Sequence, residues 1–340
     1  MSTIRKVVIT KCGTPLTNLE IQTATIPSPA KNEVQVDILY AGFGGSDINM
    51  RLGRYPMQKK APLTPGYCFT GRVSSNGPGA KRFPVGTFVT AVTVYDSHAE
   101  KINIPEKYLV AIPDGVSIQE ACALPVDCAT AYGMVYRAAK VQKGQRVFVH
   151  GLSGAIGNAV SLLCQLQGAT VYGTASERNH ETVRRAGAIP FVYTDKKWMD
   201  EMKSLGGVHA VFDPLGFESF DESYSILSEK EHSILVGYAT NKAAMDDKSG
   251  VIAPQPMGQI AKMYATSALC WGKKSFSFFY IGRDQATYKP ELEKLLGMLR
   301  DGQIVVPIKK VWDMEDIREA HAGWGKVSGV GSLLIRVGKE

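Results

Sequence analysis

The residues with the clearest chemical potential form a glycine-rich run from His150 to Gly157, with the sequence HGLSGAIG. Its glycines recur every third residue, between a β-branched stretch and a stretch with helical periodicity. Such a turn lets backbone N–H groups approach a pyrophosphate, and the dipole of the following helix favours the negative charge. Glycine patterns also occur in purely structural turns, but this flanking pattern favours a dinucleotide. The predicted contacts are Gly151, Ser153, Gly154, Ala155, Ile156 and Gly157.

The residues that follow the next predicted strand bear on which nicotinamide cofactor is used. An NAD site usually places Asp or Glu at the tip of that strand, against the ribose 2′-hydroxyl. Here the tip reads Ala175-Ser176, followed by Glu177 and Arg178. A small tip beside a guanidinium suits a 2′-phosphate, so Ser176 and Arg178 predict NADPH. Glu177 supports the alternative of NAD, because a shift of one residue would place it at the tip.

Strands alternate with helices around this run, which predicts right-handed crossovers and a parallel sheet. A capping box at Ser117–Glu120 starts a helix that Pro125 is expected to interrupt, and a second helix follows from about Cys128 to Ala139. The remaining predicted elements are strands at Arg146–His150, Val171–Ala175, Ala210–Asp213 and Ser233–Gly237, and helices at Ile156–Gln167 and Glu181–Ala186.

The two ends of the chain have a different texture. The first 110 residues or so read as short strands and turns of an irregular barrel, including Glu33–Leu39, Thr87–Val94 and Lys101–Ile104. A helix with Pro290 in its first turn, a strand at Val305–Val311, a helix at Met314–Gly323 and a strand at Ser332–Val337 close the chain. The alternating region is therefore expected to be inserted between two parts of another domain.

Composition excludes several classes of protein. The chain has 340 residues, 44% of them hydrophobic and 21% charged, with a net charge of +7. These values fit about two soluble domains and exclude bulk disorder. The basic residues are scattered dyads rather than a stripe, so no nucleic acid is expected, and no apolar run is long enough for a membrane span. The start lacks the pattern of a signal peptide and the six cysteines include no CxxC, so a cytoplasmic location without disulfides is expected.

Together these motifs resemble the medium-chain dehydrogenase/reductase superfamily, in its zinc-free quinone oxidoreductase-like or enoyl reductase-like branch. The stretches that carry the resemblance are Ala41–Asp47 with Arg51 and Gly53, Thr64–Gly66, Ile104–Glu106, Ala123–Pro125, Ala129–Tyr132, the glycine run, Gly173–Ser176 and the tail from Ser275 to Gly302. The resemblance implies an α/β fold with a GroES-like β-rich catalytic domain at 1–124 and 284–340. A Rossmann domain with a doubly wound parallel sheet is implied at 125–283, with NADPH in the cleft and a possible homodimer paired near Phe276–Ile281.

The resemblance also implies that no metal is held. The zinc-binding relatives have a Cys where this chain has Gly44, a His-Glu pair where it has Tyr67-Cys68, and a third ligand near Val126. Catalytic zinc needs three protein ligands, and glycine and valine supply none. Gly44 also departs from the Asn of the quinone reductase-like pattern, so the pocket is larger and lacks an amide donor.

The family pattern assigns roles to a further set of residues. Thr130 corresponds to a threonine near the nicotinamide amide, although a helix-interior Thr can simply bond to its own backbone. Tyr55 matches an aromatic at the cleft mouth that could donate to a developing oxyanion, or could only pack. Asp47 and Arg51 lie four residues apart and are expected to form a structural ion pair rather than act in catalysis. Tyr193 corresponds to a tyrosine against the adenosine 2′-phosphate, or is a surface aromatic.

Other candidates follow from the ends of the predicted strands. Ligands of such sheets bind outside the carboxyl strand ends, which makes Asp213, Gly237 and Tyr238 candidate cofactor contacts. Ser328 begins a stretch that matches a late cofactor loop of the family more loosely. The stretch 239–275, which is rich in Met and aromatic residues, is either a core helix or a wall over an apolar substrate. His98 and His321 have no visible orienting partner and are expected at the surface or at the edge of the cleft.

Without a Lewis acid, the expected chemistry is hydride transfer from NADPH to an activated C=C bond or a quinone. The substrate is expected to be a small apolar molecule that contains a carbonyl group, whose oxygen gathers negative charge and needs hydrogen-bond donors. A zinc-independent carbonyl or imine reductase is an alternative within this class. A second alternative is an NADPH-binding protein with mainly an interaction role, which the missing donor at Gly44 favours. A zinc alcohol dehydrogenase is disfavoured by the missing ligands.

Overall fold

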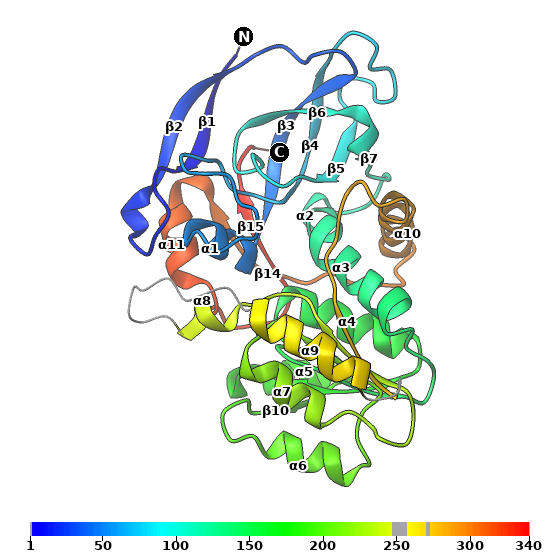
Figure 1. Ribbon diagram of the computed structural model, residues 1–340. Coiled ribbons are helices and arrows are strands. Elements are labelled where there is room, and N and C mark those ends of the chain that lie inside the picture. Colours follow the sequence, from blue (N-terminus) through cyan, green and yellow to red (C-terminus); the bar gives the residue numbers. More distant parts are fainter. Residues whose placement is uncertain (1, 247–256, 270–272, 340) are drawn as a thin grey trace. The chain divides into compact units, whose positions relative to one another are not determined.

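The computed structural model describes residues 2–246, 257–269 and 273–339 (Figure 1). Contacts divide these residues into two compact units. Unit 1 holds the chain up to Ala129, then Gly282–Val327 and the end of the chain from Ser332, whereas unit 2 holds Thr130–Ile281 and Ser328–Gly331. The chain crosses between the units after Ala129 and after Ile281, where 124/125 and 283/284 were predicted, and it enters unit 2 a second time for four residues.

Unit 1 is built on a seven-stranded sheet with the order β14-β15-β3-β4-β5-β7, in which β6 also pairs with β3. A separate antiparallel pair, β1-β2, completes its strands. The strands are β1 Ser2–Ile9, β2 Leu19–Ile26, β3 Glu33–Phe43, β4 Cys68–Asn76, β5 Phe88–Val92, β6 Lys101–Pro105, β7 Val110–Ala111, β14 Ile308–Asp313 and β15 Ser332–Arg336. Its helices are α1 Gly45–Arg51, α2 Ile118–Ala123, α10 Tyr288–Arg300 and α11 Ile317–Gly323, with short helices η1 Leu16–Asn18, η2 Glu106–Tyr108 and η6 Met314–Asp316.

Strand β4 was not predicted, because Gly71 and two serines weaken its β pattern. The register of the sheet explains why glycine is present. A Cβ at position 71 would lie 2.3 Å from the carbonyl oxygen of Asp37 on β3, closer than real contacts allow. Glycine therefore lets β4 lie against the irregular part of β3.

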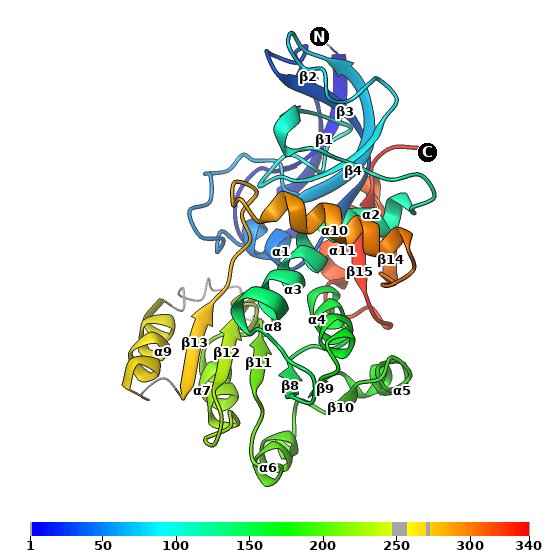
Figure 2. The same cartoon turned by 90° about the vertical axis from the view of Figure 1, so that its right-hand side faces the viewer.

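Unit 2 contains a six-stranded parallel sheet with the order β10-β9-β8-β11-β12-β13, which Figure 2 shows from one edge to the other. Its strands are β8 Arg146–Val149, β9 Thr170–Thr174, β10 Ile189–Phe191, β11 Ala210–Asp213, β12 Ser233–Gly237 and β13 Lys274–Phe278. Its helices are α4 Ala155–Leu166, α5 His180–Arg185, α6 Lys197–Ser204, α7 Glu218–Ser225, α8 Lys242–Asp246 and α9 Met257–Leu269, with the short η5 Glu177–Asn179. This is the Rossmann strand order, and it reverses direction between β8 and β11.

The mixed α/β architecture confirms the predicted fold class. β11 and β12 have the predicted bounds, β8 ends one residue earlier than predicted, and β9 both begins and ends one residue earlier than predicted. β13 is the edge strand of the unit 2 sheet and overlaps the first half of Phe276–Ile281, the stretch expected to pair in a dimer. Of the Met- and aromatic-rich stretch, Met263 is buried on α9 while Tyr264 is exposed, and Trp271 lies outside the described residues.

The predicted helix break at Pro125 is wrong. The chain stays helical through η3 Leu124–Cys128, α3 Ala129–Tyr132 and η4 Gly133–Ala138, of which η3 and η4 are π-type turns. In η3 the N–H of Ala129 donates to the carbonyl of Leu124, five residues earlier. The wider turn accommodates a proline, which lacks an N–H and would break an ordinary α-helical ladder.

The core of unit 2 is centred on Trp198 of α6, which is 1% exposed and stacks on Phe148 of β8 with ring centroids 4.8 Å apart. Replacing a buried aromatic with alanine leaves a cavity. We therefore expect Trp198→Ala to lower the free energy of unfolding by about 3–5 kcal/mol in urea denaturation. Leu205→Ala, at the exposed end of the same helix, is the control and should cost much less; equal losses would contradict this account of the core.

Candidate functional site

The glycine run forms a tight turn between β8 and α4 in unit 2. Gly151 has φ +74°, in the left-handed region that favours glycine, and Gly154 caps the first turn of α4. A Cβ on Gly157 would lie 2.2 Å from the carbonyl oxygen of Gly151. The helix therefore starts against the backbone of the turn. Because the first N–H groups of a helix lack intrahelical acceptors, those of Ala155 and Ile156 are available to an anion.

The tip of β9 has the register expected for a small residue. β9 ends at Thr174, and the N–H of Ala175 still donates to the carbonyl of Phe191 on β10. Ser176 then caps η5, in which Glu177 and Arg178 are both exposed. Glu177 thus lies beyond the tip, on the short helix. Tyr193 follows β10 and is 57% exposed.

The second entry of the chain into unit 2 brings a distant segment to this turn. The N–H of Gly331 donates to the carbonyl of Ser153 at 3.3 Å, and the N–H of Gly329 donates to Oδ1 of Asn179 at 2.9 Å. Ser328 therefore begins a loop that lies between the glycine turn and the end of η5. Asn179 is buried and was not predicted, because its only signal in the sequence is an amide just after the strand tip.

The candidates at the ends of β11 and β12 are held within unit 2. Oδ1 of Asp213 accepts the N–H of Leu215, and its Oδ2 accepts the hydroxyls of Ser219 and Ser223, each at 2.7 Å. A Cβ on Gly237 would lie 2.7 Å from Cζ of Phe220. Tyr238 follows, half-buried, and its N–H donates to the carbonyl of Asp213. Asp213 is thus fully engaged with the protein, and its role toward a cofactor stays a prediction.

Thr130, the first residue of unit 2, is buried in α3. Asp47 and Tyr55, two further residues to which the family pattern assigns roles, belong to unit 1.

Asp47 holds the start of α1. Its Oδ2 accepts the N–H of Gly44 at 2.9 Å and its Oδ1 accepts the N–H of Gly66 at 3.1 Å. Burial raises the pKa of Asp47, and the nearby His98 partly offsets this shift. The carboxylate therefore ties the turn before α1 to the Thr64–Gly66 segment, and its contacts are with the backbone.

The predicted ion pair between Asp47 and Arg51 is wrong. Nη1 of Arg51 donates to the carbonyls of Gly13 and Thr14, at 2.9 and 2.7 Å, and its Nε donates to Nδ1 of His321 at 3.3 Å. The i,i+4 spacing permits a pair only where both side chains lack better partners. Here the Asp47 carboxylate accepts backbone N–H groups, and Arg51 donates to backbone carbonyls and to His321, so the two side chains do not pair.

His98 and His321 are buried, so their expected position at the surface or the cleft edge is wrong. His98 is 0% exposed, with Nε2 3.1 Å from the carbonyl oxygen of Gly42. The ring of Phe43 lies edge-on to His321, at a centroid distance of 5.1 Å. Burial, the charge of Arg51 and the proximity of His98 lower the pKa of His321 well below its usual value. Its imidazole is therefore neutral at neutral pH.

Two tyrosines pack together beside this region. The rings of Tyr55 and Tyr67 are 5.2 Å apart and inclined by 59°. Burial raises the pKa of both phenols, so each stays protonated and can donate a hydrogen bond. Tyr55 is half-buried and Tyr67 is buried. Tyr55 is thus the more accessible donor.

Gly44 and Gly42 differ in the space around them. Gly44 has an extended backbone with φ −166°, and a Cβ built on it meets no atom within 4 Å. A Cβ on Gly42 would lie 2.4 Å from Sγ of Cys68, whose thiol donates to the carbonyl of Cys122. Position 44 can therefore accept a side chain, whereas position 42 is filled by Cys68.

Across the described residues, no three His, Cys, Asp or Glu side chains are grouped as a metal site would require. The absence of zinc stays a prediction from the ligand positions. None of the helices in the described part of the chain is both long and apolar enough to cross a membrane.

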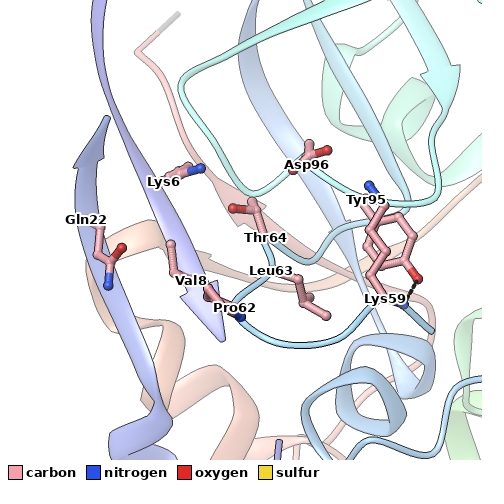
Figure 3. A pocket seen from close by; sticks show the side chains of 9 residues that line it. All are labelled: Lys6, Val8, Gln22, Lys59, Pro62, Leu63, Thr64, Tyr95 and Asp96. Carbon is pink, nitrogen blue, oxygen red and sulfur yellow. Dashed lines mark hydrogen bonds between the residues drawn. The ribbon is translucent and has the colours of Figure 1, made fainter. Parts of the chain in front are cut away.

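A pocket of about 250 Å³ lies in unit 1, and none of the predicted site residues is among those that line it. Figure 3 shows the residues around it, which are Lys6, Val8, Gln22, Lys59, Pro62, Leu63, Thr64, Tyr95 and Asp96. The backbone N–H of Lys59 donates to the phenol oxygen of Tyr95 at 3.0 Å. No sequence pattern indicates this pocket, because its residues come from β1, β2 and two loops.

Comparison with known proteins identifies the family. Residues 30–129 match the alcohol dehydrogenase GroES-like domain, and residues 155–264 match the zinc-binding dehydrogenase domain. The chain belongs to the medium-chain dehydrogenase/reductase superfamily, in its quinone oxidoreductase-like branch. The word "zinc" in the second description refers to the wider family. It does not identify any residue of this chain as a zinc ligand.

Three relatives illustrate the match. The mouse synaptic vesicle membrane protein VAT-1 homolog-like is 27% identical over 99% of this chain and 82% of its own length. The crystal structure of the human VAT-1 homolog-like protein superposes with a TM-score of 0.82 at 26% identity, covering 100% of both chains. The Escherichia coli quinone oxidoreductase complexed with NADPH has a TM-score of 0.82 at 20% identity, covering 99% of this chain and 100% of its own, and shows the shared fold.

The close contact at Gly157 gives a direct test of the turn. Because its Cβ would meet the Gly151 carbonyl, we expect Gly157→Ala to lower the free energy of unfolding by about 1–3 kcal/mol. Gly258→Ala on α9, where a Cβ meets nothing within 4 Å, is the matched control and should change it by less than about 0.5 kcal/mol. Urea denaturation measures both variants; equal stabilities would contradict the described turn.

The buried His321 predicts a pH dependence of stability. Its pKa in the folded protein lies well below the ordinary 6.5, so below pH 6.5 the unfolded chain binds the proton that the folded chain excludes. The free energy of unfolding should therefore fall as the pH drops, by up to about 1.4 kcal/mol per pH unit from this group. His321→Gln should reduce this slope between pH 7 and 5, whereas His232→Gln, at an exposed position, should not. Identical slopes for the two variants would overturn the prediction.

Proposed function

We propose that the protein is an NADPH-dependent oxidoreductase that reduces an activated C=C bond or a quinone without zinc. The observation that carries the proposal is the glycine turn of unit 2, where Gly157 lets α4 start against the backbone of Gly151. In folds of this kind the third glycine of the turn lets the helix pack against the strand, and the start of the helix then faces the pyrophosphate. The superfamily is one of oxidoreductases, and the quinone oxidoreductase relative was solved with NADPH.

The cofactor residues fit NADPH better than NADH. NADPH supplies a hydride when it is bound. The N–H groups at the start of α4 hold its pyrophosphate in this proposal, and Ser176, Arg178 and Tyr193 take the 2′-phosphate. Two features support this choice: Glu177 lies beyond the strand tip, and Arg178 is exposed beside it. The loop that starts at Ser328, with Gly237 and Tyr238, completes the proposed contacts.

Side chains of unit 1 and Thr130 handle the substrate and the nicotinamide in this proposal. The Tyr55 phenol, which stays protonated, donates to the oxygen that gains charge as an enone or quinone is reduced. Thr130 offers its hydroxyl to the nicotinamide amide. Asp47 acts as a positioning residue, because both of its oxygens hold backbone N–H groups. The substrate is a small apolar molecule with a carbonyl group, and a homodimer formed through the β13 edge is part of the proposal.

A second candidate is an NADPH-binding protein whose main role is interaction. The observation that favours it is Gly44, which supplies no amide where the quinone reductase-like pattern has one. A zinc-independent carbonyl or imine reductase is the nearest alternative within the enzyme class.

One assay separates these candidates. NADPH oxidation is followed at 340 nm with a panel of enones, quinones, aldehydes and cyclic imines, each at saturating concentration. Turnover of enones or quinones supports the proposal, and turnover of only aldehydes or imines favours the alternative reductase. Tight NADPH binding with no turnover across the panel would favour the interaction role. A failure to bind NADPH in a fluorescence titration would overturn the proposed reductase and the NADPH-binding interaction role alike.

The choice of cofactor has its own test. Removing the guanidinium beside the 2′-phosphate should weaken NADPH binding in Arg178→Ala by about tenfold, with little effect on NADH. Arg184→Ala, an exposed arginine on the neighbouring α5, is the control and should change neither affinity. Isothermal titration with both nucleotides provides the measurement, and an equal loss for NADPH and NADH would contradict the role of Arg178.

The open space at Gly44 allows the missing amide to be restored. Because its Cβ meets no atom and its backbone is extended, we expect Gly44→Asn to fold with a free energy of unfolding within about 0.5 kcal/mol of the parent. If the amide adds a donor toward the substrate, kcat/KM for a small quinone should rise, and Gly44→Val should lower it by filling the same space. Equal effects of the two side chains would show that only volume matters at this position.

A further inference from the structure

The buried ring of His150 lies directly before the glycine turn, and neither the sequence pattern nor the comparisons assign it a role. We infer that His150 is a positioning residue, which fixes the turn through a chain of hydrogen bonds running from the Gly151 N–H to the carboxylate of Asp213. The inference rests on the proposed function, since what the turn is positioned for is the pyrophosphate of the cofactor.

Four hydrogen bonds join five groups in this chain, all within unit 2. The N–H of Gly151 donates to Oγ1 of Thr174 at 3.2 Å, and that oxygen lies 3.2 Å from Nδ1 of His150. Nε2 of His150 lies 3.0 Å from Oγ of Ser223, which donates to Oδ2 of Asp213 at 2.7 Å. The chain therefore connects the carboxyl ends of β8, β9 and β11 with helix α7.

The hydrogen atoms of this chain have one consistent arrangement. The Asp213 carboxylate can only accept hydrogen bonds, so the single hydrogen of the Ser223 hydroxyl is donated to it. Its oxygen must then accept from His150, which places the ring hydrogen on Nε2. Nδ1 is left as an acceptor and takes the hydroxyl hydrogen of Thr174, whose oxygen accepts the Gly151 N–H. The carboxylate thus selects the Nε2–H tautomer of His150 through the hydroxyl of Ser223, which lies between them in the chain.

The surroundings keep this ring neutral. Burial lowers the pKa of His150; the charges of Asp213 and Glu222 act against the shift, and that of Lys196 adds to it. Phe148 of β8 and Trp198 of α6 lie edge-on to the ring at 5.2 and 5.1 Å, so these two elements pack aromatic rings against it. A second ring proton would leave the Thr174 hydroxyl hydrogen without an acceptor in this chain.

The consequence for the turn is local. Both N–H groups that follow His150 are used by one residue, because Gly151 donates to the Thr174 side chain and Leu152 donates to the Thr174 carbonyl at 2.8 Å. These bonds hold Gly151 at φ +74° and direct the first two N–H groups toward β9. The N–H groups at the start of α4 are then the ones available to the phosphates. Loosening the chain should therefore weaken cofactor binding and leave the chemical step unchanged.

The first test needs no cofactor. In ¹⁵N-labelled protein, the imidazole nitrogen shifts of His150 should report the neutral Nε2–H tautomer from pH 8 down to at least pH 6. In Asp213→Asn the side-chain amide can donate to Ser223, which reverses the chain and should move the ring hydrogen to Nδ1. A wild-type Nδ1–H tautomer, or a ring that titrates near pH 6.5, would overturn the inference.

The second test measures binding and catalysis separately. Ser223→Ala should raise the Kd for NADPH by about tenfold and raise the KM for NADPH, with kcat at saturating NADPH unchanged. Ser225→Ala on the same helix is the matched control, because its hydroxyl is exposed and bonds only within α7. His150→Gln, which retains a donor and an acceptor, should fall between Ser223→Ala and the parent. An unchanged Kd in Ser223→Ala would overturn the inference.

The two failures can be told apart. If the parent protein binds no NADPH, the proposed function fails, whereas the tautomer measurement still decides whether the chain of hydrogen bonds exists. If the parent binds NADPH and the tautomer is as expected, but Ser223→Ala binds equally well, only the positioning role fails. Should Ser223→Ala unfold, the comparison is made with His150→Gln and the wild-type tautomer.

Discussion

The contact on which the nucleotide unit depends is the approach of Gly157 to the carbonyl of Gly151. A Cβ at position 157 would lie 2.2 Å from that oxygen, so the start of α4 and the end of β8 can meet only through glycine. This one contact sets the direction of α4, and with it the direction of the unbonded N–H groups of its first turn. The loop Ser328–Gly331 contacts the same turn, because the N–H of Gly331 donates to the Ser153 carbonyl. The proposed binding of a pyrophosphate is a consequence of this backbone geometry, more than of any side chain.

In both units, buried polar side chains hold neighbouring elements together. Their hydrogen bonds go mainly to backbone groups or to one another. Asp47 ties the start of α1 to Gly66, and Asp213 ties the end of β11 to α7. Because a buried carboxylate without partners is costly, each of these groups fixes its surroundings tightly. In the proposed chemistry these two carboxylates position the backbone around the site. They need not contact the substrate to do so.

The protein shares the fold of its family but departs from the family's sequence pattern at Gly44. The fold matches relatives across the whole chain, yet Gly44 leaves open space where the family pattern has an amide. Under the proposed function, a site with fewer hydrogen-bond donors favours an apolar substrate, and the proposed donor to its oxygen is Tyr55. The same departure is what keeps an interaction role under consideration, and it makes position 44 the most informative one to change.

The sequence alone determined the parallel sheet, the glycine turn and the order of the two kinds of domain, because these follow from local periodicity and from glycine at fixed spacings. It placed β11 and β12 correctly and the tip of β9 at Ala175-Ser176. Only the tertiary structure decided the partners of side chains far apart in the chain. It gave Arg51 to Gly13, Thr14 and His321 instead of Asp47, and docked the loop after Ser328 on Asn179. Local spacing shows which groups can meet, but burial and competing partners from other elements decide which of them do.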